Sequence, residues 1–123
     1  MRAGLIALVL ALLLPAAAGA HQPSDAYLSL TVDGSRVEGR WDIALRDLEH
    51  AIGLDADGDG SITWGEVRAR HAAIAAYALA RLELAADGAV CPTTAREQLI
   101  ERHSDGAYTV LRFAAACPAP VGA

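Results

Sequence analysis

The chain has 123 residues, a formal net charge of −5 at pH 7, and ten basic residues, all of them arginine. A chain of this length forms one domain with a modest core. Because no basic run is present to neutralise phosphates, the composition argues against nucleic-acid binding. An acidic chain instead suits divalent cations.

The first twenty residues have the pattern of a secretory signal peptide. Arg2 supplies a positive charge, residues 5–14 form an apolar run, and residues 18–20 (Ala-Gly-Ala) give a small-residue cleavage pattern. The alternative is a membrane span, which needs about 20 apolar residues, and this run is shorter. We therefore expect cleavage after Ala20, leaving 21–123 as a mature chain of charge −6 without a membrane span, in the periplasm or secreted.

The mature chain begins with strand signals. Residues 26–32 and 36–45 alternate between apolar and polar positions and are rich in β-formers. Asp33-Gly34 lies between them and is a hairpin turn signal. The pattern predicts a β-hairpin with Trp41 on its apolar, core-facing side.

Helical spacing follows the hairpin. Residues 46–54 predict a short helix, and a sequence rich in alanine and arginine predicts a longer helix over 64–82. His71 lies on the apolar stripe of the longer helix, so we expect a partly buried histidine with a hydrogen-bond partner. Trp64 is expected to be more exposed and available to a partner.

Strand signals return near the C-terminus. A short strand is expected at 82–86, ahead of a turn at Asp87-Gly88. Residues 98–103 and 107–113 flank Ser104-Asp105-Gly106 and predict a second hairpin. The last residues, 118–123, are expected to fray.

The clearest chemical signal lies between the two predicted helices. Residues 55–66 are Asp-Ala-Asp-Gly-Asp-Gly-Ser-Ile-Thr-Trp-Gly-Glu, which matches D-x-[DN]-x-[DN]-G-x5-E at every defined position. Ca²⁺ takes about six to eight oxygen ligands in a flexible cage. The pattern predicts a calcium site with these ligands: Asp55, Asp57, Asp59, Ser61 (through its carbonyl) and Glu66.

Other positions of the loop have supporting roles. Gly60 allows the sharp turn, Thr63 acts through a water molecule, and Ile62 points into the core. The alternative is an Asp-Gly turn that binds nothing, but four carboxylates at these positions would repel one another without a cation. Mg²⁺ is the weaker candidate, because it prefers a tight octahedral shell with several waters.

Helix, twelve-residue loop and helix together resemble the EF-hand family. Together with the strand patterns, this predicts a fold class of α+β: two β-hairpins packed with one EF-hand helix–loop–helix at about 46–82, within a single domain of residues 21–123. EF-hands usually occur in pairs, whereas this chain has one loop of the pattern. We therefore expect a modest affinity and a calcium ion that is structural or used for partner docking, not a sensor.

Cys91 and Cys117 are the two cysteines of the chain. After export they can oxidise, and an even count in a small secreted domain predicts a structural disulfide. It would close a loop of about 27 residues and add roughly 3.5 kcal/mol in the chain-entropy model. The alternative is two free thiols.

A second resemblance covers most of the mature chain. The segments 21–30, 39–48 and 106–111, together with the loop, resemble the exported N-terminal domain of HupE/UreJ-type membrane proteins. In that family a multi-helix membrane part linked to nickel transport follows the domain, which implies a membrane-protein partner. Because the chain stops before any such helix, we expect either a free-standing version or a truncated reading frame.

Two further hypotheses belong to other classes. Cleavage after Ala20 would leave His21 as an N-terminal ligand for Ni²⁺ or Cu²⁺, with a second histidine supplied by one of three: His50, His71 or His103. The chain would then be a periplasmic metal-handling accessory. The other hypothesis is an interaction module without metal. No catalytic motif is present, so we do not expect an enzyme.

Overall fold

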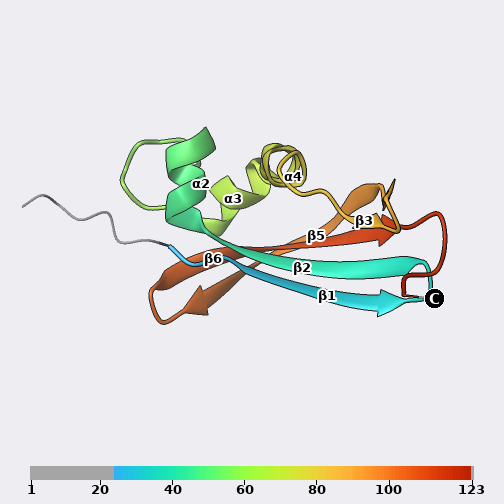
Figure 1. Ribbon diagram of the computed structural model, residues 1–123. Coiled ribbons are helices and arrows are strands. Elements are labelled where there is room, and N and C mark those ends of the chain that lie inside the picture. The colour runs from blue at the N-terminus through green and yellow to red at the C-terminus, as the bar shows by residue number, and fades with distance from the viewer. Residues whose placement is uncertain (1–23, 123) are drawn as a thin grey trace, which may run out of the picture.

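The structure is a computed structural model that describes residues 24–122 (Figure 1). The predicted signal peptide, residues 1–20, and His21 lie outside the described residues. Four antiparallel strands form one sheet in the order β1-β2-β6-β5. Their bounds are β1 Tyr27–Asp33, β2 Arg36–Ala44, β5 Thr93–His103 and β6 Gly106–Ala116.

Three short helices and a minor sheet complete the described part of the chain. The helices are α2 Leu45–Ile52, α3 Trp64–Ala69 and α4 His71–Leu79, and all three lie on one face of the main sheet (Figure 1). The minor sheet pairs β3 Ala85–Ala86 with β4 Ala89–Val90 around the predicted Asp87-Gly88 turn. Within residues 24–122, no helix has the length and hydropathy needed to span a bilayer.

The predicted packing of two hairpins with an EF-hand helix–loop–helix is wrong. The pairs β1–β2 and β5–β6 are not separate units, because β2 pairs with β6 along its whole length, from Arg36 opposite Ala116 to Ala44 opposite Tyr108. One continuous sheet results, and the architecture is mostly β. Alternation of apolar residues identifies strands, but it does not state which strands pair when they are far apart in sequence.

The predicted single helix over 64–82 is also wrong. The helix breaks at Arg70, where φ is −99° and ψ is 9°, and α4 ends at Leu79. The Arg70 side chain reaches back to carbonyl oxygens at the end of α2. This tertiary contact lies at the break, and local helix propensity carries no signal for it.

The two faces of the main sheet have different surroundings. Trp41 on β2 and Leu111, opposite it on β6, pack with Ala75 and Ala78 of α4. We call the face that carries Trp41 and Leu111 the helix-side face. Trp41 is half-buried there, which confirms the core-facing position predicted for it. Successive strand residues point to opposite faces, so Asp42 lies on the other face. No helix of the described chain covers that open face (Figure 1).

A second part of the core joins the helices to the ends of the α2–α3 loop. It contains five buried residues: Leu45, Leu48, Leu54, Val67 and Ile74. Ile62 packs against them, as the sequence predicts. Burying side chains of this size contributes about 1.5–3 kcal/mol each, so both ends of the loop are attached to a rigid layer.

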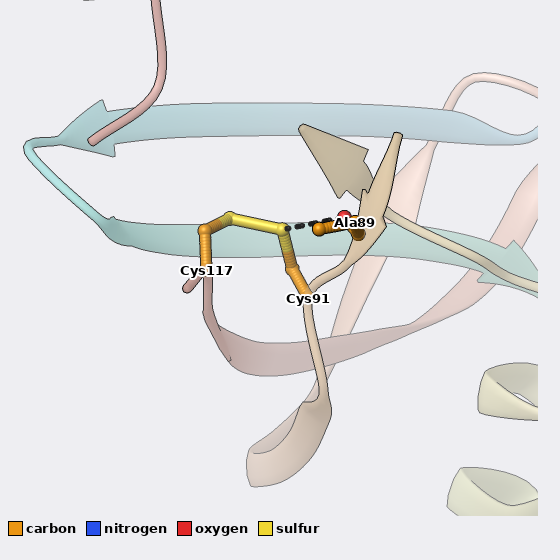
Figure 2. The surroundings of a disulfide bond; sticks show 3 residues. All are labelled: Ala89, Cys91 and Cys117. Atoms are coloured by element: carbon orange, nitrogen blue, oxygen red, sulfur yellow. Dashed lines mark hydrogen bonds between the residues drawn. A yellow bond between two sulfur atoms is a disulfide. The ribbon is translucent and has the colours of Figure 1, made fainter. Parts of the chain in front are cut away.

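The two cysteines form the predicted disulfide. Cys91 lies between β4 and β5, Cys117 follows β6, and their Cα atoms are 4.2 Å apart (Figure 2). Cys91 Sγ is 3.9 Å from the carbonyl oxygen of Ala89. The Cys117 N–H donates to the Ser35 carbonyl at 2.8 Å. The disulfide therefore ties the end of β6 to the minor sheet beside the β1–β2 turn, and disulfides are typical of oxidising compartments.

Candidate metal-binding loop

The entrance of the loop is set by the end of α2. Gly53 ends the helix with φ 71°, a conformation that favours glycine, and its N–H donates to the Glu49 carbonyl at 3.0 Å. Arg70 donates to the Ile52 carbonyl at 2.9 Å and to the Gly53 carbonyl at 3.3 Å. The carbonyls left free at the helix end thus gain a cationic partner from the α3–α4 junction.

Glu49 fixes the next two residues. Its carboxylate oxygen Oε2 accepts the N–H of Asp55 at 2.8 Å and also the N–H of Leu54. Leu54 is buried in the helix-layer core. The backbone at Asp55 is therefore held from one side by a hydrogen bond and from the other by packing.

The three aspartates of the motif converge. Carboxylate oxygens of Asp55, Asp57 and Asp59 lie within 4.8 Å of one another. Loop N–H groups hold them: Gly60 donates to Asp55 Oδ2 at 2.8 Å. The Asp59 N–H donates to Asp55 Oδ1 and Asp57 Oδ1, each at 3.2 Å. The Ser61 N–H donates to Asp59 Oδ1 at 2.9 Å. Gly60 has φ 82° with open space around it, so conformation alone requires glycine there.

Glu66 lies across the loop, in the first turn of α3. Thr63 is the N-cap of that helix, and its hydroxyl accepts the Glu66 N–H at 3.2 Å. In return, Glu66 Oε1 accepts the Thr63 N–H at 3.0 Å, which completes a capping box. The other oxygen, Oε2, accepts the Ala56 N–H at 2.6 Å. Glu66 therefore joins the loop's exit to its entrance, although its oxygens are outside the three-aspartate group.

The hydrogen bonds and charges of the loop shift the pKa values of its carboxyl groups in opposite directions. The Gly60 N–H lowers the pKa of Asp55, and the Thr63 N–H lowers the pKa of Glu66. The Asp59 N–H acts to lower the pKa of Asp57, but the Asp55 carboxyl, burial and the charge of Glu66 outweigh it, so the pKa of Asp57 is raised. Negative charge is thus crowded at Asp57, and a bound cation would relieve it.

Sequence reasoning missed the two residues that support the loop from outside, Glu49 and Arg70. Neither belongs to the twelve-residue pattern. Both lie on helices, where a charged residue on the surface is ordinary. The only available signal would have been the four-residue step from Glu49 to Gly53, which places the Glu49 side chain near the helix end.

A second acidic group lies on the open face. Ligand atoms of Asp42, Glu101 and His103 are within 4.8 Å of one another. Arg40 donates to both oxygens of Asp42 at 2.8 Å and also pairs with Glu101, while His103 Nε2 is 2.9 Å from Asp42 Oδ2. A guanidinium already supplies the cation, so we assign an ion-pair network. The alternation of β2, which places Arg40 and Asp42 on one face, could have predicted the pair.

The structure separates the histidines proposed as partners of His21. His71 is half-buried, with Nδ1 2.7 Å from the Gln98 side-chain oxygen, as expected for a partnered histidine. Gln98 is opposite Leu111, on the helix-side face, whereas His103 contacts Asp42 on the open face. His50 is exposed on α2. His71 and His103 are therefore not brought together.

Comparison of the chain with protein-family models, curated proteins and solved structures finds no match. The two family resemblances of the sequence thus stay predictions, and it is the geometry of the loop that bears on function.

Proposed function

We propose that the chain is an exported protein that binds one calcium ion in the loop from Asp55 to Glu66. The observation that carries the proposal is the convergence of Asp55, Asp57 and Asp59, with carboxylate oxygens within 4.8 Å of one another. Each carboxylate has about four lone-pair sites. An oxygen that accepts a loop N–H therefore still has a lone pair for a cation.

The proposed ligands are the three aspartate carboxylates, the Ser61 carbonyl and Glu66, with Thr63 acting through a water. These are all oxygens, which suits a hard divalent cation. Calcium is favoured over magnesium because the loop offers many protein oxygens on a flexible backbone, whereas magnesium keeps most of its waters. The ion would hold the exit of the loop, at Glu66, against its entrance, at Asp55.

A structural or docking role fits the way the loop is attached. Leu54 and Ile62, near its two ends, pack into the core shared by the three helices. An ion bound between those ends stabilises the helical layer as a whole. With a dissociation constant near the ~10⁻⁴–10⁻³ M of extracellular calcium modules, a tenfold excess of calcium over that constant adds about 1.4 kcal/mol.

The Cys91–Cys117 disulfide supports the exported location, because disulfides persist in oxidising compartments. Calcium is also abundant outside the cytoplasm, which matches a site of modest affinity. The relation to HupE/UreJ-type proteins is kept as a prediction.

Calorimetric titration of the purified chain with Ca²⁺, together with thermal melts in millimolar Ca²⁺ and in chelator, tests the proposal. We expect one site per chain and a melting temperature that rises with calcium. The same titration with Mg²⁺ should give weaker binding. No heat and no thermal shift at millimolar Ca²⁺ would overturn the proposal.

Glu66→Gln is the sharpest variant. Glutamine can still accept the Thr63 N–H, so the capping box and the melting temperature in chelator are largely kept. The charge and the two-oxygen contact with calcium are lost, so the calcium-induced shift should disappear. Asp25→Ala, which removes an exposed aspartate outside the loop, is the matched control and should keep the shift.

A further inference from the structure

The two edges of the main sheet are built differently. β5, at one edge, carries four charged residues and an irregularity between Ala95 and Gln98, both of which discourage another strand from pairing. β1, at the other edge, has neither. Its sequence is Tyr-Leu-Ser-Leu-Thr-Val-Asp, its register with β2 is regular over all seven residues, and its only charge is the terminal Asp33.

β1 is also exposed along its whole length. Leu28, Leu30 and Val32 are 46%, 44% and 49% exposed. They are opposite Trp41, Gly39 and Val37, so they share the helix-side face. In the described chain this edge has a strand on one side only. A regular edge strand with an apolar face and a single terminal charge is a template for strand pairing.

We propose that β1 pairs antiparallel with β1 of a second copy of this chain, giving a two-fold dimer with one continuous eight-stranded sheet. A two-fold axis normal to the sheet keeps the faces aligned, so Leu30 lies opposite Leu30 of the second copy. Leu28 is then opposite Val32, and Ser29 is opposite Thr31. All seven residues of the strand pair, and apolar side chains meet apolar ones.

Charge also fits this register. Asp33 falls opposite Tyr27 of the second copy, on the open face, and not opposite another acid. Tyr27 stacks on His103, with ring centroids 5.1 Å apart, so the carboxylate approaches a hydroxyl and an imidazole. Pairing centred on Ser29 would instead place Asp33 opposite Asp25, and like charges directly opposite are destabilising.

The surface beside β1 can receive the second copy. An apolar hollow of about 120 Å³ lies between β1, the minor sheet and the disulfide, and Val32 and Val37 are among its lining residues. Because Leu28 of the second copy is opposite Val32, its side chain falls at the rim of this hollow. Two such contacts occur, one on each side of the axis.

The proposal is tested by measuring the oligomeric state of the purified chain by light scattering and sedimentation, in calcium and in chelator. We expect a dimer in both conditions, because the pairing does not use the loop. Leu30→Lys places two ammonium groups opposite each other and should weaken the dimer at least about tenfold. Ile100→Lys, at the other edge, should not. A monomer at all concentrations, or a dimer that Leu30→Lys leaves intact, would overturn the proposal.

Cysteine variants test the register without relying on a lysine variant that folds. Residues directly opposite have Cα atoms about 4.5–5.5 Å apart, within disulfide range, so Leu30→Cys should form a covalent dimer on oxidation. Two copies of residue 28 would be about 14 Å apart in this register, so Leu28→Cys should not. Equal cross-linking of the two variants would contradict the register.

Discussion

The aromatic ring of Phe113 lies directly over the backbone of Gly39, its partner on the neighbouring strand. A Cβ added at Gly39 would be 2.1 Å from Phe113 Cζ and within 2.5 Å of two further ring atoms. Phe113 is completely buried. Glycine at position 39 therefore makes room for the largest apolar side chain of β6 on the helix-side face.

Gly39→Ala should destabilise the fold. The ring has to move within a closely packed core, which costs about 1–3 kcal/mol, so the melting temperature should fall by roughly 5–15 °C. Gly65→Ala is the matched control, because Gly65 lies in α3 with its nearest neighbour at 3.8 Å, and alanine there favours the helix. Gly39→Ala should destabilise a Phe113→Leu variant less than it destabilises the wild-type chain, because the smaller leucine side chain leaves room for the added methyl group.

Reducing the disulfide should lower the free energy of unfolding by about 3.5 kcal/mol, because Cys91 and Cys117 are 26 positions apart and the open chain gains loop entropy. Urea denaturation with and without reductant measures the difference. The double variant Cys91→Ser/Cys117→Ser should have the stability of the reduced protein, and its urea midpoint should not change when reductant is added. Equal midpoints for the oxidised and reduced protein would contradict a stabilising role.

Asp42 should make the stability depend on pH in the acid range. Its hydrogen bonds from Arg40 and then His103 hold the pKa below the ordinary 3.8, although burial opposes them. A pKa that is lower in the folded state gives stability that is present above about pH 4 and is lost as the pH falls through the folded value.

Asp42→Asn should therefore cost roughly 1–3 kcal/mol at pH 7 and flatten the acid limb of a stability profile measured by urea denaturation. Arg40→Gln removes the main partner and should give a smaller loss in the same direction. If Asp42→Asn kept the wild-type slope below pH 4, the carboxylate would not be the group responsible.

Calcium binding should be visible in the fluorescence of Trp64. This tryptophan is 39% exposed, lies beside Glu66 in the first turn of α3, and has the Arg68 guanidinium 5.6 Å from its ring centre. The second tryptophan, Trp41, is half-buried against α4. Titration of Trp64→Phe with calcium should show no change, whereas Trp41→Phe should keep the wild-type change. If Trp41→Phe lost the fluorescence change and Trp64→Phe kept it, the change would come from Trp41 in the sheet, which contradicts the prediction.

Local patterns predicted local structure. The first hairpin was placed within one residue at each strand end, because alternation and the Asp33-Gly34 turn act over a few residues. The loop pattern likewise brought Asp55, Asp57 and Asp59 to one place, since backbone N–H groups of the same short segment hold them. The core position of Ile62 was likewise predicted from its place in the loop pattern, and the disulfide was predicted because the chain has two cysteines.

Most of what the sequence did not predict depends on contacts between distant segments. The pairing of β2 with β6 and the break at Arg70 each need a partner whose position is set by the whole fold. The hydrogen bonds of Glu49 to Leu54 and Asp55 are local, but Glu49 lies outside the twelve-residue pattern. The Arg40–Asp42–His103 network is intermediate, because alternation predicts the first pair but only the register of β5 supplies the histidine.

The order β1-β2-β6 has a mechanical consequence. β1 and β6 run in the same direction, with β2 between them. The start of β1 and the end of β6 therefore lie at opposite ends of the sheet (Figure 1). A tension applied between Tyr27 and Ala116 would slide these strands along each other, loading the hydrogen bonds of both ladders at once. The domain is thus arranged to resist stretching in shear instead of unzipping bond by bond.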